Sequence, residues 1–215
     1  MNNRVCAIVV TYNTSGGIDE LIATLASQCD RVVVVDNGSA PEARARITSA
    51  CTVKGVHLIP LPTNMGIAHA QNRGIDYARD CGCALALLSD DDSVPPGNMV
   101  PRLVDALRHE QRGNKVAAVG PLVGELKPGG DQLVYVARRW GPRRATPSEL
   151  EKSALPVAFL VASGCLIDLD AISDVGPMND SLFIDHVDLE WCLRARRRGW
   201  GLICATDIHM GHSLG

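Results

Sequence analysis

Nearly continuous apolar runs alternate with helix-like segments through the first half of the chain. Runs of this kind are typical of parallel strands that are covered on both faces. The strand-like runs are residues 5–11, 31–36, 56–60, 83–88 and 116–120. The helix-like segments are residues 17–27, 41–50, 65–79 and 98–111. Strands that alternate with helices predict βαβ units, and therefore an α/β fold whose mostly parallel central sheet is flanked by helices.

The pattern changes in the second half of the chain. Residues 121–157 are rich in Gly, Pro and Arg, so we expect an irregular excursion or hairpin over the sheet there. The elements predicted after it are a strand at 158–168, a helix at 184–198 and a last strand at 201–205. Ser163 and Gly164 interrupt the first of these strands. A chain of 215 residues suffices for one domain, which we divide into residues 1–120 and 121–215.

Composition narrows the class of protein. Apolar residues make up 46% and charged residues 21%, as is usual for a soluble globular domain. A net charge of -3 gives no support for nucleic-acid binding. The sequence shows no signal peptide, and no apolar stretch reaches the ~20 residues that span a bilayer. Eight cysteines without a CxxC pair predict buried, reduced thiols, and we therefore expect a cytoplasmic protein.

The triplet Asp90-Asp91-Asp92 follows directly on the apolar run at residues 83–88. Open α/β sheets bind ligands at the carboxyl ends of their strands. Carboxylate oxygens at such a place suit a hard divalent cation that also holds substrate phosphates. An acidic turn followed by a helix N-cap explains the same residues, so the triplet needs support from the rest of the chain.

Two other predicted strands end in polar residues. Thr11, Tyr12 and Asn13 follow the first strand, and Asp36 and Asn37 end the second. Asp36 can accept a hydrogen bond from a pyrimidine N–H or a ribose hydroxyl. Each segment alone is explained by a turn, but three polar strand ends on one edge favour a nucleotide crevice. No GxGxxG or Walker A sequence follows the first strand, which argues against dinucleotide and P-loop sites.

The segment from residue 64 to 74 carries small residues at alternate positions. Asn64 is the expected N-cap of the helix that follows, and Gly66 allows close approach of a backbone or a ligand. Asn72 and Arg73 can reach a base or a diphosphate. A capped and tightly packed helix explains the pattern equally well, and both interpretations stay open.

A second acidic cluster lies at the start of the predicted helix at 184–198. Asp188 is the candidate general base for an acceptor hydroxyl, with Asp185 in reserve. Acidic residues are also common at helix N-termini for electrostatic reasons alone. Glu190 and Arg194 are spaced for a local ion pair. His212 follows the last strand and can complete a divalent metal shell, although an ordinary surface histidine is the simpler explanation.

Taken together, these motifs resemble the family 2 glycosyltransferases of the GT-A fold, in the expected order and over essentially the whole chain. They are TYN at 11–13, DNGS at 36–39, NxGxAxAxN at 64–72, DDDS at 90–93, SGCLI at 163–167 and the acidic helix start. Residues 182–194 and 211–215 are similar to bacterial rhamnosyltransferases. The resemblance implies a Rossmann-like sheet that binds a nucleotide sugar in its first half, and a smaller mixed region on the acceptor side.

The resemblance also implies an inverting transfer, with dTDP-rhamnose as the expected donor and other dTDP- or UDP-sugars as the wider class. Asp36 would contact the nucleotide base, and the segment at 11–13 would line the same pocket. Asn37, Asn64, Gly66, Asn72 and Arg73 complete the expected substrate-binding set.

The metal and the base follow from the same resemblance. Asp92 would bind Mg²⁺ or Mn²⁺ bridging the diphosphate, and Asp90 would contact the ribose or the metal, with Asp91 beside the substrate. His212 would be a further metal ligand. Asp188 would deprotonate the acceptor hydroxyl. A diphosphate leaving group needs charge neutralisation and a sugar hydroxyl needs a base, so the chemistry is consistent.

The expected acceptor is a hydroxyl of a saccharide or a lipid-linked sugar in bacterial surface polysaccharide synthesis. Peripheral association with the inner face of the cytoplasmic membrane is a further expectation. Full-length relatives continue past residue 215, so we expect the sequence to be truncated at its C-terminus.

Two other functions remain as alternatives. A nucleotidyltransferase acting on a sugar phosphate would also join a nucleotide-binding sheet to carboxylate-bound metal. It normally needs a Gly-rich, basic phosphate loop after the first strand, which residues 11–17 match poorly. A non-catalytic sugar-nucleotide-binding module would bind the donor and transfer nothing, and the intact set of acidic residues argues against it.

Overall fold

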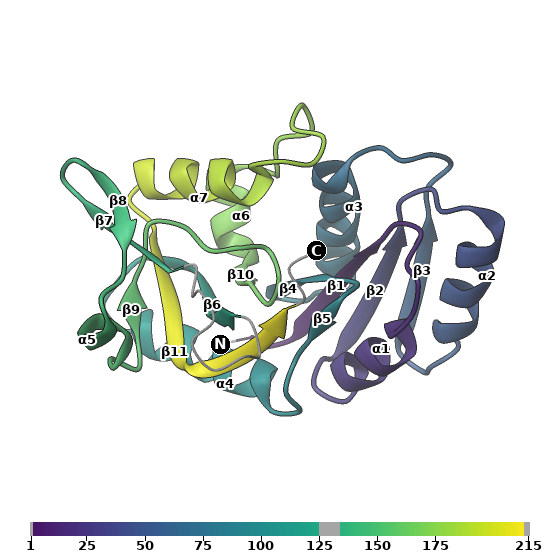
Figure 1. Cartoon of the computed structure of the whole chain (residues 1–215), viewed down its shortest axis with the longest axis horizontal. Helices are drawn as coiled ribbons and strands as arrows, with labels where there is room; N and C mark the ends of the chain where they lie inside the picture. The colour runs from purple at the N-terminus through teal and green to yellow at the C-terminus, as the bar shows by residue number, and fades with distance from the viewer. Residues whose placement is uncertain (1, 125–133, 213–215) are drawn as a thin grey trace.

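The computed structural model describes residues 2–124 and 134–212, which form a central sheet between two layers of helices (Figure 1). The strand order is β3-β2-β1-β4-β10-β6-β11-β5, with β9 paired to β11. The first four strands are parallel to one another. They are β1 (Val5–Thr11), β2 (Arg31–Asp36), β3 (Val56–Pro60) and β4 (Leu85–Asp90). The α/β fold and the parallel first half are therefore confirmed.

Helices cover both faces of the sheet because each strand has apolar side chains on both sides. One face packs against α1, α2 and α4, and the other against α3, α6 and α7. The first group is α1 (Ile18–Ala26), α2 (Pro41–Ala50) and α4 (Met99–Glu110). The second is α3 (Ile67–Asp80), α6 (Leu169–Val175) and α7 (Val187–Arg197).

The second half of the sheet is mixed. The short strand β10 (Leu166–Asp168) lies antiparallel between β4 and β6 (Val116–Gly124). The long strand β11 (Gly201–His212) runs parallel to β6, and its far end pairs with β5 (Ser93–Val94). This pairing brings the end of β11 beside the segment that follows the acidic triplet.

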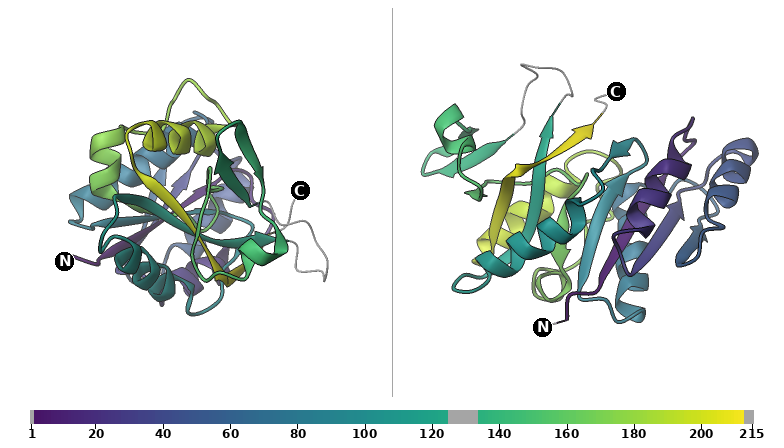
Figure 2. Two further views of the ribbon diagram at one scale, coloured as in Figure 1. Left: turned by 90° about the vertical axis from the view of Figure 1, so that its left-hand side faces the viewer. Right: turned by 90° about the horizontal axis from the view of Figure 1, so that it is seen from below.

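A separate hairpin lies at one end of the molecule, opposite α2 (Figures 1 and 2). It consists of β7 (Tyr135–Arg138) and β8 (Gly141–Arg144), followed by α5 (Pro147–Leu150) and β9 (Leu155–Pro156). The expectation of a hairpin between residues 121 and 157 is thus confirmed for its second part, while residues 125–133 lie outside the described residues.

Three predictions of local structure need correction. Only Leu166–Asp168 of the predicted strand at 158–168 is a strand, because Gly164 adopts a positive φ of 78° and the chain turns there. The helix α6 was not predicted at all. The N-cap of α3 is Gly66 and not Asn64. The side-chain oxygen Oδ1 of Asn64 accepts a hydrogen bond from the backbone N–H of Gly66 at 3.0 Å.

The eight cysteines are all free and at least partly buried, as their scattered spacing predicts. Burial raises the pKa of the Cys192 and Cys204 thiols to about 12, so both remain protonated at neutral pH. Among the described residues, none of the helices is both long enough and apolar enough to cross a lipid bilayer.

Gly74 allows α3 to lie directly on β1. A Cβ atom at Gly74 would stand 2.2 Å from Cγ2 of Ile8, a fully buried side chain. We expect Gly74→Ala to destabilise the fold by about 1–3 kcal/mol, because the strain of overpacking outweighs the better helix propensity of alanine. Urea unfolding measures the change. Gly113→Ala is the control, since no atom lies within 4 Å of its added methyl; equal stability of the two variants would contradict the packing argument.

Candidate functional site

Three polar strand ends meet at one edge of the sheet. In the parallel register Thr11 lies beside Asp36, and Val10 lies beside Asp90. The carboxyl ends of β1, β2 and β4 are therefore neighbours, as the sequence predicts. Ligands of open α/β sheets bind at this edge.

The loops after β1 and β2 are joined by hydrogen bonds around Asn13. Its backbone N–H donates to Ser39 Oγ at 2.9 Å, and its Oδ1 accepts from the backbone N–H of Ala40 at 2.8 Å. Asn13 has a positive φ of 54°, which asparagine tolerates better than most residues. Tyr12 is half exposed beside it, while Thr11 is fully buried and its hydroxyl has no partner among the described residues.

Asp36 is completely buried, and its charge is compensated from within the chain. Arg44 Nε donates to Oδ2 at 2.9 Å, and the backbone N–H of Ser39 donates to Oδ1 at 3.1 Å. The arginine also donates to the carbonyl of Leu61 at 3.1 Å. A nucleotide base that contacts Asp36 would therefore meet a carboxylate already paired with Arg44.

Asn37 and Asn64 connect the end of β2 to the start of α3. Asn37 Nδ2 donates to Asn64 Oδ1 at 2.9 Å, and Asn37 Oδ1 accepts from the backbone N–H of Met65. A Cβ at Gly66 would lie 2.6 Å from the carbonyl oxygen of Phe183, so the close approach here is made by the protein's own backbone. The glycine thereby lets the loop before α7 dock on α3.

Asn72 and Arg73 lie elsewhere. Asn72 Nδ2 donates to the carbonyl of Met178 at 2.9 Å and to Asp180 Oδ1 at 2.6 Å, and its Oδ1 accepts from the backbone N–H of Met178. Arg73 is exposed. The amide of Asn72 therefore holds the segment after α6.

The three aspartates at and directly after the end of β4 have different surroundings. Asp90 Oδ2 accepts a hydrogen bond from Ser163 Oγ at 2.8 Å. Asp91 is hydrogen-bonded by Thr14 and by the backbone of Tyr12, whereas Asp92 is exposed. Burial and then the neighbouring charge of Asp92 raise the pKa of Asp91. Negative charge is therefore concentrated at the carboxyl end of β4.

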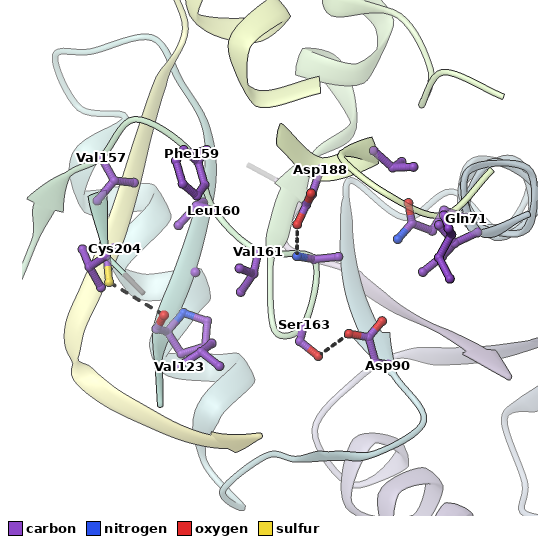
Figure 3. A pocket seen from close by; sticks show the side chains of 17 residues that line it. Gln71, Asp90, Val123, Val157, Phe159, Leu160, Val161, Ser163, Asp188 and Cys204 are labelled. Atoms are coloured by element: carbon purple, nitrogen blue, oxygen red, sulfur yellow. Dashed lines mark hydrogen bonds between the residues drawn. The ribbon is translucent and has the colours of Figure 1, made fainter. Parts of the chain in front are cut away.

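Asp188 faces Asp90 across a short loop that binds both residues (Figure 3). The backbone N–H of Ala162 donates to Asp188 Oδ2 at 3.2 Å, and the next residue, Ser163, donates to Asp90. Two adjacent residues thus fix the positions of two carboxylates that are far apart in sequence. Ser163 Oγ also lies 2.8 Å from Ser93 Oγ, which ties both ends of the acidic turn to this loop.

The rest of the second acidic cluster has other roles. Asp185 is exposed and is not among the residues that line the cavity described next. The predicted pair of Glu190 and Arg194 is confirmed, with two bonds of 2.8 and 2.7 Å. Arg194 also donates to the carbonyls of Val175 and Pro177, which joins α7 to α6.

Asp90 and Asp188 line one cavity of about 210 Å³ between α3, α7 and the loop of Ser163 (Figure 3). Its walls are mainly apolar and include Ile67, Val134, Val157, Phe159, Leu160, Ile184 and Val187. The other long polar side chain that lines it is Gln71, which sequence reasoning missed. Its position four residues after Ile67 on the same helix face was the available signal.

With this geometry established, comparison with known proteins identifies the family. The family model described as "Glycosyl transferase family 2" matches residues 6–176. The chain belongs to glycosyl transferase family 2.

Two similar proteins are also glycosyltransferases. The chain is 31% identical over 216 aligned residues to the dTDP-rhamnosyl transferase RfbF of Shigella flexneri, covering 100% of this chain and 71% of that protein. It is 25% identical over 201 residues to the low-salt glycan biosynthesis hexosyltransferase Agl10 of Haloferax volcanii, covering 92% of this chain but only 63% of that protein.

The fold is that of GT-A glycosyltransferases. A crystal structure of GalNAc-T7 with UDP, GalNAc and Mn²⁺ superposes with a TM-score of 0.79 at 14% identity, covering 98% of this chain and 44% of that chain. The mannosyltransferase PcManGT of Pyrobaculum calidifontis, in complex with GDP-Man and Mn²⁺, gives 0.69 at 18% identity, covering 100% and 58%. This chain thus spans about half the length of these solved proteins.

The donor set of this family 2 domain fits a divalent metal only in part. Within residues 2–124 and 134–211, no three His, Cys, Asp or Glu side chains gather as metal ligands. Mg²⁺ usually takes one or two carboxylates together with water and substrate phosphates, which the clustered aspartates can supply. The backbone of His212 pairs with Ser93, which directly follows the three aspartates. The structure does not describe the side chain of His212.

Ser163 is the residue that joins the acidic turn to the loop, and it is 2% exposed. We expect Ser163→Ala to lower the free energy of unfolding by about 1–3 kcal/mol, because the partly buried carboxylate of Asp90 and the buried hydroxyl of Ser93 each lose a hydrogen bond. Urea unfolding measures it. Ser15→Ala changes an exposed serine away from the loop of Ser163 and should alter stability by less than about 0.5 kcal/mol. A loss no larger than that of this control would show that Ser163 does not hold the turn.

Proposed function

We propose that this family 2 domain transfers a sugar from a nucleotide diphosphate sugar to an acceptor hydroxyl, with inversion and with a divalent metal. The observation that carries the proposal is the cavity that places Asp90 and Asp188 together, bridged by Ala162 and Ser163. One carboxylate belongs to the acidic turn at the nucleotide edge and the other to the start of α7. This pairing supplies a donor side and an acceptor side to one cavity.

The donor in this proposal is dTDP-rhamnose, which the 31% identity to a dTDP-rhamnosyl transferase supports. The nucleotide lies along the carboxyl ends of β1 and β2, between Thr11, Tyr12 and Asp36. Asn13, Asn37, Asn64 and Gly66 shape the surrounding loops through the hydrogen bonds and the close contact described above.

Mg²⁺ or Mn²⁺ at Asp92 and Asp90 would neutralise the diphosphate as it leaves, and His212 is a proposed further ligand. Asp91 belongs to the same turn and holds it against the loop after β1. Asp188 accepts the proton of the acceptor hydroxyl as that oxygen attacks the anomeric carbon from the face opposite the diphosphate. The N–H of Ala162 orients the carboxylate of Asp188 for this role.

The acceptor in the proposal is a hydroxyl of a saccharide or a lipid-linked sugar, and the pathway is bacterial surface polysaccharide synthesis. A cytoplasmic location at the inner face of the membrane fits the expected source of nucleotide sugars. The apolar walls around Asp188 suit the carbon-bound hydrogens of a sugar ring.

Nucleotide preference is the first test. Calorimetric titration with dTDP, UDP and GDP should show the tightest binding for dTDP, and that binding should require Mn²⁺, because the metal offsets repulsion between diphosphate and aspartates. Preference for UDP would retain the transferase and change the sugar. Absence of binding by all three nucleotides would contradict the proposed function, and release of pyrophosphate from a nucleoside triphosphate would favour a nucleotidyltransferase.

Two variants separate metal binding from proton transfer. Asp92→Ala should abolish the Mn²⁺-dependent part of dTDP binding, whereas Asp188→Asn should bind dTDP as the wild type does. The second variant should release dTDP from dTDP-rhamnose about 10²–10⁴-fold more slowly, with water or a saccharide as acceptor, because a general base is lost. Normal turnover of Asp188→Asn together with loss in Asp185→Asn would move the base to Asp185.

A further inference from the structure

Gln71 is a buried polar side chain whose hydrogen bonding is incomplete. It is 3% exposed, and its carbonyl oxygen Oε1 has no partner among the described residues. It lies on α3 and lines the cavity that also contains Asp90 and Asp188. Figure 3 shows its amide group directed from the helix toward the side of the cavity where Asp188 lies.

An orphan carbonyl of this kind is costly in a folded protein, because it has lost water and gained nothing in return. Two other glutamines of the chain have partners at both ends of their amides. Gln111 bonds Arg108, the carbonyl of Val116 and Asp168, and Gln28 bonds the carbonyl of Pro96 and the N–H of Val100. Gln71 differs from both because its carbonyl oxygen has no partner among the described residues, which points to a ligand as the missing donor.

The surroundings of Gln71 define the chemistry of that ligand. Oε1 is an acceptor, so the ligand must donate a hydrogen bond. In the proposed function the metal and the diphosphate belong to Asp90 and Asp92, and the negative charge of Asp188 on the same cavity disfavours a further phosphate group beside Gln71. The apolar walls formed by Ile67, Val187 and their neighbours need a largely apolar surface against them. A sugar ring combines hydroxyl donors with faces of carbon-bound hydrogen, and no charge.

We propose that Gln71 Oε1 accepts a hydrogen bond from a hydroxyl of the sugar ring that lies between Asp90 and Asp188. The residue is thus a specificity-determining contact to the sugar, and not to the nucleotide. The proposal rests on the proposed function and names the group that positions the sugar within that site. The donor sugar and the acceptor sugar carry the same hydroxyl chemistry, and the experiment distinguishes them.

The test compares Gln71→Met with the wild type. Methionine keeps the length of the side chain and removes the orphan carbonyl. We measure calorimetric dissociation constants of dTDP and of dTDP-rhamnose in Mn²⁺, and thermal unfolding without ligand. If Gln71 serves ligand binding and not stability, Gln71→Met should have a melting temperature equal to or above that of the wild type. The affinity for dTDP should not change; if the contact is to the donor sugar, the affinity for dTDP-rhamnose should fall about three- to tenfold, as expected for one lost hydrogen bond.

Gln111→Met is the matched control, because Gln111 is fully partnered and does not line the cavity. It should melt at a lower temperature and bind dTDP and dTDP-rhamnose in the wild-type ratio. Gln71→Leu repeats the test if Gln71→Met does not fold. A melting temperature reduced in both Gln71 variants as in the control would overturn the proposal, since it would assign Gln71 a structural role.

The source of the hydroxyl follows from a second arm. Saturation-transfer NMR with the methyl glycosides of rhamnose, glucose and N-acetylglucosamine probes the acceptor side. Loss of donor affinity in Gln71→Met assigns the contact to the donor sugar, and loss of glycoside binding with normal donor affinity assigns it to the acceptor. If neither changes, or if dTDP and dTDP-rhamnose weaken equally, the proposal is wrong. A wild type that binds neither dTDP nor dTDP-rhamnose would instead contradict the proposed function.

Discussion

The loop of Ala162 and Ser163 sets the geometry on which the site depends. One residue binds the carboxylate of Asp188 through its backbone and the next binds Asp90 through its hydroxyl. Neighbouring residues in a chain are held about 3.8 Å apart at Cα, so the two carboxylates cannot separate freely. The loop stays in place because Gly164 turns it at positive φ between Pro121 and Met210, and the N–H of Gly164 bonds the carbonyl of Leu88. Sheet, loop and both acids therefore form one unit.

Hydrogen bonds between loops complete the edge formed by the carboxyl ends of β1, β2 and β4. Asn13 links the turns after β1 and β2, and the paired amides of Asn37 and Asn64 link β2 to α3. These bonds satisfy backbone groups that a parallel sheet leaves open at its strand ends. Thr11 and Gln71 are not part of this network, because each has a buried oxygen without a partner within residues 2–124 and 134–212. Buried polar atoms that lack a hydrogen-bond partner are expected where a site is shaped for a ligand.

Sequence patterns were reliable where the structure is local and periodic. The parallel strands and five of the helices lie within a few residues of their predicted bounds, since burial on both faces produces continuous apolar runs. They failed at residues 158–168, whose apolar character comes from the cavity wall more than from strand pairing. The sequence also contained no sign that the amide of Asn72 bonds a segment more than a hundred residues away.

The sequence by itself determined the α/β class, the polar strand ends at one edge and the two acidic clusters, because each is written in a short stretch of chain. Only the tertiary structure decided that Asp188, and not Asp185, shares a cavity with Asp90, and that Arg44 pairs with Asp36. It also decided that the carbonyl oxygen of Gln71 has no hydrogen-bond partner in the part of the chain that the structure describes. These facts depend on which irregular segments cross the sheet and where they stop. Such long-range contacts are set by packing and leave no periodic signal in the residues that make them.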